Sequence, residues 1–246
     1  FFGYHVSFVD SFGLASAQLP PQGLAVAPKN FEHCRIMRNT LELSDVSGGG
    51  AELFLYQSGY LTIKEYDEFG YVLGFPNEEV KQALYEMVLP TLTLREESDI
   101  QSLQADLYVQ LGTAQIDEAM KSLKALIADV PYSNKKLDSM DMEERYRLII
   151  STILNAIGLK VEVEKMIATG RIDMIVQTSR YIYVIELKLR NNVGKEAATD
   201  QILNRQYMES FKADKRQVIG LGIELDEKGK GLLDWKREWN RLEVAG

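Results

Sequence analysis

Residues 170–190, GRIDMIVQTSRYIYVIELKLR, place charged side chains inside two runs that are otherwise built for burial. The Ile, Val, Met and Tyr residues predict two β-strands joined by a short turn. Asp173 lies in the first strand, and Glu186 and Lys188 lie in the second. Because an unpaired charge is costly to bury, we expect these three side chains to compensate one another or to form a site.

Side chains alternate between the two faces of a strand, so Glu186 and Lys188 share a face with Val184. A two-residue turn at 178–179 sets Asp173 opposite Val184 and diagonal to Glu186, at about 7–8 Å between backbones. A four-residue turn keeps this pairing, whereas a three-residue turn would move Asp173 to the other face. With a two- or four-residue turn, both carboxylates can reach a common point.

Two carboxylates that converge on an apolar face repel each other, so one takes up a proton or a cation neutralises the pair. Oxygen ligands suit Mg²⁺ or Mn²⁺, which keep several waters and bind phosphate at their remaining positions. Lys188, next to such an ion, could orient an attacking water and offset charge that grows on phosphorus. These residues predict a site for phosphodiester hydrolysis. The alternative is that Glu186 and Lys188 form a solvated sheet edge and that Asp173 only begins a strand.

A helix should bring a further acid to this site. Residues 142–158, MEERYRLIISTILNAIG, have the apolar spacing of an amphipathic helix. Glu143 joins the apolar face, whereas Glu144 falls with Ser151 and Asn155 on the exposed side. We therefore prefer Glu143 to Glu144 as the acid that binds the metal or one of its waters. The apolar face consists of Tyr146, Ile149, Ile150, Ile153, Leu154 and Ile157.

The remaining pattern divides the chain into three parts. Residues 1–50 are rich in Gly, Ala and Pro and are expected to be irregular. Residues 51–135 predict a mainly helical, winged-helix-like module that contains a hairpin and a helix capped by Asn77. Residues 136–246 predict an α/β domain in the order helix, strand, strand, helix, strand, with its second helix over about 195–211.

The net charge of −8, from 28 basic and 36 acidic residues, argues against a surface coated with phosphate-binding charge. A nucleic-acid surface would therefore be local, and the segment 143–190 has a small excess of basic residues. Ordinary solvated charges are an equal alternative. Trp235 and Trp239 predict packing of a terminal helix rather than base stacking. The basic candidates are Arg145, Arg147, Lys160, Lys165, Arg171, Arg180, Arg190, Lys195, Arg205, Lys212, Lys215 and Arg216.

The cysteine and histidine content indicates a reducing compartment and argues against a disulfide framework or a zinc site. The single cysteine, Cys34, excludes an internal disulfide and fits the reducing cytoplasm, and His5 and His33 lack a zinc-ligand spacing. No apolar run approaches the roughly 20 residues of a membrane-spanning helix, and the apolar start lacks the basic leader of a signal peptide. Because the sequence does not begin with Met, we expect a piece of a longer chain or a processed product.

Taken together, these patterns resemble the PD-(D/E)xK nuclease superfamily. More narrowly, they are similar to the nuclease-like domain found at the C-terminus of bacterial proteins that begin with an AAA-ATPase-like domain. The similarity extends over about residues 52–235. The residues that carry it in the α/β part are Glu143, Tyr146, Glu164, the GRID tetrapeptide ending at Asp173, the YVIELK run with Glu186 and Lys188, Gln201 and Tyr207.

The resemblance implies a restriction-endonuclease-like α/β core, with a central mixed sheet flanked by helices. It implies that Asp173 and Glu186 hold Mg²⁺ or Mn²⁺, that the Leu187 carbonyl also binds the ion, and that Lys188 assists the water. Gln201 stands where such domains often carry a supporting polar residue, although a partly exposed helical glutamine is an equal alternative. The implied activity is that of a metal-dependent nuclease, with DNA expected rather than RNA.

Three features depart from the resembling proteins. The chain has no GxxxxGK[ST] motif, so it should not hydrolyse ATP, and the ATPase is expected upstream or lost. Arg147 stands where the resembling sequences more often carry a neutral or His side chain, which could alter the electrostatics beside Glu143. The Pro of the motif is Ile172.

Two other functions remain open. The acidic composition and the lack of an evident DNA-binding patch are compatible with a catalytically idle nuclease-fold module. Such a module would bind nucleic acid or protein and regulate an associated ATPase. A purely structural α/β domain is a weaker alternative.

Overall fold

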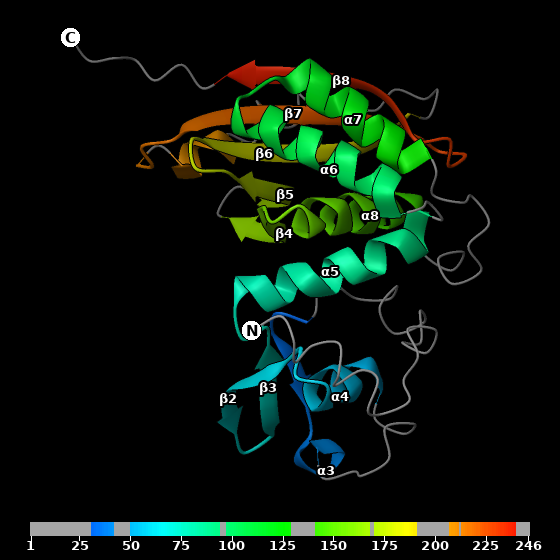
Figure 1. Ribbon diagram of the computed structural model, residues 1–246. Coiled ribbons are helices and arrows are strands. Elements are labelled where there is room, and N and C mark those ends of the chain that lie inside the picture. Colours follow the sequence, from blue (N-terminus) through cyan, green and yellow to red (C-terminus); the bar gives the residue numbers. More distant parts are fainter. Residues whose placement is uncertain are drawn as a thin grey trace. The chain divides into compact units, whose positions relative to one another are not determined.

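The computed structural model describes residues 31–41, 50–93, 97–128, 141–167, 170–190, 207–211 and 213–239 (Figure 1). The chain forms two compact units, one ending at Pro76 and the other beginning at Asn77. The predicted boundary at 135/136 differs from this division, because the helices between 78 and 128 belong to the same unit as the large sheet.

The first unit contains a three-stranded antiparallel sheet in the order β1-β3-β2. The helix α4 and the β2–β3 hairpin match the expected pattern, while the likeness to a winged helix stays a prediction. The irregular segment expected over 1–50 needs correcting at 34–41, where a strand and a short helix form. Three residues are too few to show a period, and this strand gains its hydrogen bonds from β3. The elements are β1 (Cys34–Ile36), α3 (Arg38–Leu41), α4 (Gly50–Gln57), β2 (Thr62–Asp67) and β3 (Gly70–Gly74).

The second unit is built on a mixed five-stranded sheet in the order β4-β5-β6-β7-β8. β6 and β7 run parallel, and the other neighbouring pairs are antiparallel. This agrees with the α/β core expected from the sequence. The strands are β4 (Lys160–Ile167), β5 (Gly170–Gln177), β6 (Tyr181–Arg190), β7 (Gln217–Asp226) and β8 (Leu232–Trp239).

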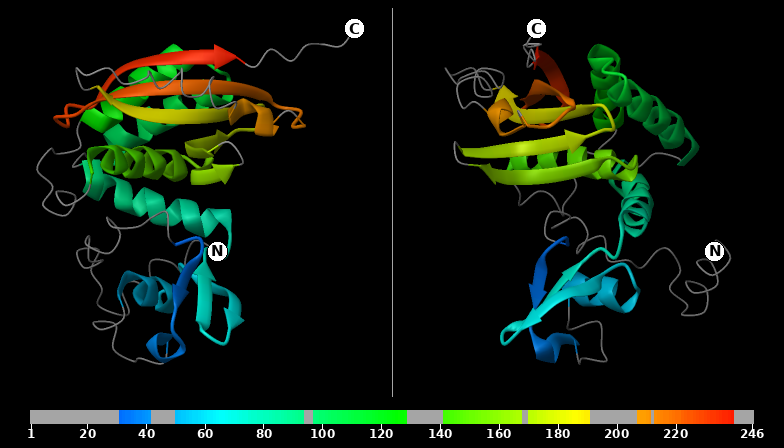
Figure 2. Two further views of the ribbon diagram at one scale, coloured as in Figure 1. Left: turned by 180° about the vertical axis from the view of Figure 1, so that it is seen from behind. Right: turned by 90° about the vertical axis from the view of Figure 1, so that its left-hand side faces the viewer.

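Helices cover the sheet. In Figure 1, α6 and α7 lie in front of β6, β7 and β8, and α8 lies in front of β4 and β5. The opposite face, turned toward the viewer in the left panel of Figure 2, carries the short helix η3, which packs against β7. Asn77 caps α5 as predicted, since its Oδ1 accepts from the Val80 N–H at 2.9 Å. The helices are α5 (Glu78–Thr93), α6 (Glu97–Gly112), α7 (Ile116–Ala128), α8 (Met142–Ala156) and η3 (Tyr207–Phe211).

Both faces of β6 are buried, which explains its almost unbroken apolar sequence. Tyr183 and Ile185 face a small apolar space between the sheet and the helices α6, α7 and α8. Ile182 and Val184 belong to a second buried cluster that includes Tyr207 of η3. Glu186, which lies within the buried run of this strand, is therefore surrounded by core.

The turn between β5 and β6 lies one position later than predicted. The Thr178 N–H donates to the Tyr181 carbonyl, and the Thr178 hydroxyl accepts from the Tyr181 N–H, both at 2.9 Å. The turn therefore consists of residues 179–180, and Gln177 pairs with Ile182. The predicted pairing of Asp173 with Val184 is wrong. Because the shift is two residues, the face of each side chain is preserved.

The exposed side predicted for the helix over 142–158 is also wrong. Its predicted apolar residues are all buried, but so are Ser151 and Asn155, and α8 packs against α5 as well as against the sheet. Their donors are bonded within the helix, since the Ser151 hydroxyl donates to the Leu148 carbonyl at 3.0 Å and the Asn155 Nδ2 donates to the Ser151 carbonyl at 2.7 Å. The Asn155 Oδ1 is buried without a hydrogen-bond partner. The helix α8 is thus enclosed between the sheet and a helix that sequence periodicity could not place.

Hydrogen bonds join the helices α6 and α7 to the sheet. The Tyr183 hydroxyl donates to the Leu111 carbonyl at 2.6 Å, and the Trp235 Nε1 donates to Asp117 at 2.9 Å. Trp235 and Trp239 lie in β8, so the terminal helix expected around them is wrong. Of the helix expected over about 195–211, only 207–211 falls within the described residues, as a 3₁₀ helix.

Candidate active site

Asp173 and Glu186 lie together where the paired parts of β5 and β6 end. The last regular pair is Met174 with Ile185, and one further step places Asp173 opposite Glu186. There the Leu187 N–H donates to Asp173 Oδ2 at 2.9 Å, and the Asp173 N–H lies 3.4 Å from Glu186 Oε1. Only 5% of Asp173 and 1% of Glu186 is exposed. The expected convergence of the two carboxylates is present, and it is closer than the predicted diagonal.

This arrangement alters the acidity of Glu186. Burial, followed by the charge of Asp173 and a hydrogen bond with the Asp173 carboxyl, raises the pKa of Glu186 to about 8. Lys188 and the Asp173 N–H act in the opposite direction. With a pKa of about 8, Glu186 keeps its proton at neutral pH, as expected when two carboxyls are forced together.

Lys188 and Glu143 approach the pair from β6 and α8. Lys188 is half-buried, and Glu143 is half-buried in the first turn of α8, where Asp141 caps the helix by accepting from the Glu143 N–H at 3.3 Å. Burial raises the pKa of Glu143, with opposing influences from the Lys188 charge, which lowers it, and the Asp173 charge, which raises it. Glu143, the acid preferred from the sequence, thus has a pKa that depends on the charges of both Lys188 and Asp173.

The donor groups suit a divalent ion only in part. Two buried carboxylates, one of which is reluctant to ionise, are what an oxygen-binding cation would neutralise. Among the described residues, however, no three Asp, Glu, His or Cys side chains are grouped closely enough to hold a metal. Glu143 therefore does not complete a three-carboxylate site with Asp173 and Glu186. Gln201 lies outside the described residues.

Arg147 is the residue that sequence reasoning undervalued. Its guanidinium is buried, with Nη1 3.4 Å from Asp173 Oδ1 and Nη2 3.3 Å from Glu164 Oε1. The sequence predicted that Arg147 would slightly alter the electrostatics beside Glu143. In the structure it forms a direct ion pair with Asp173. A sequence signal existed, because Arg147 is four residues after Glu143 and so lies on the same side of the helix.

Glu164 provides the second partner for Arg147. It stands in β4 between two pairs with β5, Val163 with Met174 and Lys165 with Ile172, so it faces Asp173 across the ladder. Its φ of 53° is in the left-handed region, which costs a non-glycine residue of order 1 kcal/mol or more. Arg171 Nη1 lies 3.1 Å from the same Glu164 oxygen.

Two tyrosines of the predicted pattern have structural contacts. The Tyr207 hydroxyl donates to the Arg171 carbonyl at 2.8 Å. The Tyr146 hydroxyl accepts from the Gly231 N–H at 2.8 Å and lies 3.2 Å from the Asp226 carbonyl, so it ties α8 to the turn between β7 and β8. Neither hydroxyl belongs to the carboxylate pair.

Several residues of the predicted basic surface are engaged internally. Besides Arg147 and Arg171, three others bind carboxylates: Lys165 binds Glu162, Arg190 binds Glu224, and Arg216 binds Asp214. Lys195, Arg205 and Lys212 lie outside the described residues. The local excess of basic residues in the sequence thus overstates the charge that is available for phosphate.

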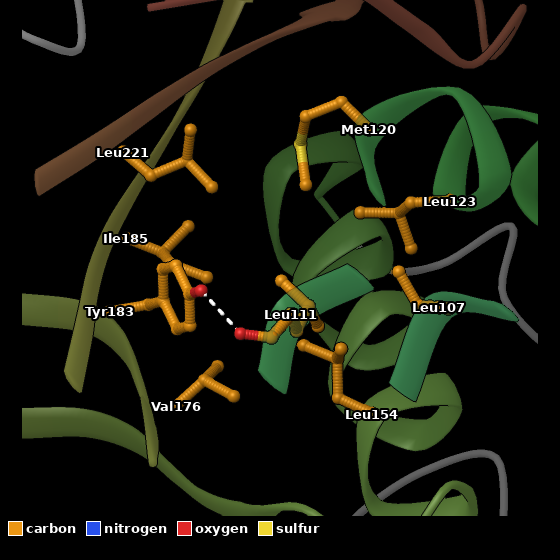
Figure 3. Close-up of a pocket in the computed structure, with 9 residues that line it drawn as sticks. All are labelled: Leu107, Leu111, Met120, Leu123, Leu154, Val176, Tyr183, Ile185 and Leu221. Carbon is orange, nitrogen blue, oxygen red and sulfur yellow. Dashed lines mark hydrogen bonds between the residues drawn. The ribbon is translucent and has the colours of Figure 1, made fainter. Parts of the chain in front are cut away.

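The apolar space drawn in Figure 3 is separate in character from this site. It is lined by side chains such as Leu107, Leu123 and Leu154 from the helices and Ile185 from the sheet. The one hydrogen bond drawn there joins Tyr183 to Leu111. It is a gap in the core and offers no charged group to a ligand.

Residues 141–235 match the family model described as the PD-(D/E)XK nuclease superfamily. This confirms the resemblance over the part of the chain that holds Glu143, Asp173, Glu186 and Lys188. The mixed sheet with flanking helices fits that fold, and the match suggests a nuclease-type function. The association with an AAA-ATPase-like domain stays a prediction.

The chain is also similar to a protein from Azotobacter chroococcum mcd 1 named "Uncharacterized protein in vnfD 5′ region". The two are 27% identical over 202 residues, which cover 79% of this chain and 38% of that relative. No solved structure matches the chain significantly. No described helix combines the length and apolar character that crossing a membrane requires.

Proposed function

We propose, from the match of residues 141–235 to the nuclease superfamily, that this chain hydrolyses phosphodiester bonds of nucleic acid in a metal-dependent reaction. The observation that carries the proposal is the meeting of the buried Asp173 and Glu186 carboxyls at the end of the β5–β6 ladder, with Lys188 beside them. Such an arrangement of two acids and an ammonium is unfavourable in a core unless it serves a function.

Asp173 and Glu186 would hold Mg²⁺ or Mn²⁺, together with the Leu187 carbonyl. The ion would supply positive charge that polarises a phosphoryl oxygen and favours the deprotonated form of a water nucleophile. The Leu187 N–H, which donates to Asp173, fixes the orientation of that carboxylate in advance. Preorganisation of this kind lowers the cost of reaching the reactive geometry.

Lys188 and Glu143 would act on the reacting groups from the other side. The Lys188 ammonium donates a hydrogen bond to the attacking water and offsets negative charge as it grows on the phosphate. Glu143, whose pKa is sensitive to Lys188, attracts the ammonium and so limits its freedom. Gln201 retains the supporting role implied by the resemblance.

The substrate proposed is DNA rather than RNA, which rests on the resemblance alone. The proposed partner is an AAA-ATPase-like domain, on the same ground. A catalytically idle nuclease-fold module is the second candidate, and the ion pair between Arg147 and Asp173 is the observation that favours it. A cation already present at Asp173 could replace the metal permanently.

Cleavage assays distinguish the two candidates. Supercoiled plasmid, single-stranded DNA and RNA would be incubated with Mg²⁺ or Mn²⁺ and with the wild type, Asp173→Asn or Lys188→Ala. Lys236→Ala is a matched control, because Lys236 is an exposed lysine in another strand of the same sheet. A nuclease requires cleavage by the wild type and the control, with losses of about a hundredfold or more in the two site variants. Equal cleavage by all four proteins would refute the assignment.

A further inference from the structure

Arg147 places a permanent positive charge next to Asp173, one of the two acids proposed to bind the metal. Only 6% of Arg147 is exposed, and its Nη1 lies 3.4 Å from Asp173 Oδ1. A guanidinium does not lose its proton in proteins, so this charge persists at every pH at which the protein is folded. A positive charge beside Asp173 opposes the binding of a second cation there.

The position of Arg147 between two strands suggests that its contact with Asp173 can be released. Nη2 lies 3.3 Å from Glu164 Oε1, so one guanidinium bridges a carboxylate of β4 and a carboxylate of β5. Both distances exceed the roughly 2.7–2.9 Å of strong charge-assisted bonds. Arg147 is therefore shared between the two acids and not locked onto either.

The backbone of Glu164 adds to this argument. A glutamate with a φ of 53° is retained only where its surroundings compensate for the strain. In this structure the compensation includes contacts with two arginines, Arg147 and Arg171. Glu164 is thus held in a conformation that presents its carboxylate to Arg147.

We propose that Arg147 and Glu164 are a pair of positioning residues that set the affinity of the site for a divalent ion. Arg147 neutralises the charge of Asp173 before the ion binds. When Asp173 binds the ion, its contact with Arg147 breaks and the guanidinium stays paired with Glu164. This inference rests on the proposed metal-dependent function and deepens it. It predicts that the two residues influence metal affinity in opposite directions.

Titration calorimetry with MnCl₂ alone tests the proposal on the full chain. Arg147→Gln should bind Mn²⁺ about tenfold or more tightly than the wild type, because the competing charge is gone. Arg147→Lys, which keeps a charge, should return toward the wild-type affinity. Glu164→Gln should bind Mn²⁺ more weakly, since Asp173 then remains as the carboxylate with which Arg147 forms its ion pair. Lys165→Gln is the matched control: Lys165 also pairs with a glutamate of β4, Glu162, at 2.8 Å, but its ammonium contacts neither Asp173 nor Glu164, and affinity should change by no more than about twofold.

Thermal melting supplies a readout that does not need turnover. Without metal, Arg147→Gln should melt below the wild type, because Asp173 loses its buried counter-charge, and saturating Mn²⁺ should close that difference. A purely structural ion pair would leave the difference unchanged. Glu164→Gln is expected to weaken Mn²⁺ binding, whereas Arg147→Gln is expected to strengthen it. The proposal can therefore be tested even if Arg147→Gln does not fold well.

The outcomes separate this inference from the function on which it rests. If the wild type binds Mn²⁺ and neither Arg147→Gln nor Glu164→Gln alters the affinity, the positioning pair is refuted while the metal site stands. Weaker binding by Arg147→Gln also refutes it. If neither the wild type nor any variant binds Mn²⁺, or if Asp173→Asn binds it as tightly as the wild type, both the metal-dependent function and the inference fail.

Discussion

The N–H of Leu187 in β6 donates a 2.9 Å hydrogen bond to the carboxylate of Asp173 in β5, just past the last regular pair of the two strands. The bond takes the place of the next rung of the ladder and fixes the carboxylate beside Glu186. A side chain proposed to bind a metal therefore also closes the strand pair. The two roles can be separated by mutation.

Asp173→Asn and Asp173→Ala should differ in stability. The asparagine oxygen can still accept from the Leu187 N–H, whereas alanine leaves that buried donor without its acceptor, at a cost of about 1–3 kcal/mol. Both changes remove the charge and should abolish metal binding. Urea unfolding without metal measures the difference in the free energy of unfolding. Equal stabilities of the two variants would show that the bond contributes nothing to folding.

The pH dependence of stability should reflect Glu186. Its pKa in the folded protein is raised from 4.5 to about 8, so the folded state binds a proton more tightly than the unfolded chain does. The resulting stabilisation is complete below about pH 4.5 and is lost as pH rises through about 8. At about 1.4 kcal/mol per pKa unit, the loss amounts to a few kcal/mol.

Melting temperatures in the presence of a chelator, recorded from pH 5 to pH 8.5, would measure this loss. The wild type should fall by roughly 5–10 °C over this range, and Glu186→Gln should remove most of the fall. Asp214→Asn is a suitable control, because the pKa of Asp214 is lowered to about 2 by Arg216, so its titration lies below this pH range and the fall should remain. A wild type that gains stability up to pH 8.5 would contradict the buried pair.

Glu143 and Glu144 offer an adjacent pair for testing the contribution of α8. Glu143→Gln should reduce cleavage about tenfold or more, because the acid near Lys188 is lost. Glu144→Gln should cleave at the wild-type rate, since the proposed site does not include it. Single-turnover rates at saturating Mg²⁺ compare the two. A larger loss in Glu144→Gln would show that the choice between them is wrong.

The extent of the folded unit can be tested with two fragments. Residues 77–246 include the helices α5 to α7, whereas residues 136–246 begin after them and lose the contacts of Leu111 with Tyr183 and of Asp117 with Trp235. We expect the longer fragment to unfold cooperatively and the shorter one to lack a cooperative transition, as followed by circular dichroism and urea titration. Cooperative unfolding of 136–246 would support the boundary first expected from sequence.

The part of the site that sequence predicts is the part governed by local periodicity. Alternation along strands placed Asp173 and Glu186 on one face, and this survived a turn that was misplaced by one position, because the resulting shift is even. The turn itself was missed because the Thr178 hydroxyl bonds to the backbone of Tyr181. Such local side-chain bonds compete with the turn that composition favours.

The remaining errors concern contacts between distant segments. The ion pairs of Arg147 depend on Glu164, whose left-handed backbone has no sequence signature. The spacing of four between Trp235 and Trp239 places both on one face of a helix, but it does the same on a strand, so it could not reveal β8. Asn155 is buried in a helix that packs against α5, an element from far earlier in the chain, so local periodicity could not predict its burial.

The bond from the Gly231 N–H to the Tyr146 hydroxyl links the turn after β7 to the helix that carries both Glu143 and Arg147. A substitution at residues 227–230 that moves Gly231 would therefore shift that helix and, with it, two residues of the proposed site. Random mutagenesis of this chain should therefore include that turn, because a small displacement of its backbone is transmitted through Tyr146 to the helix α8.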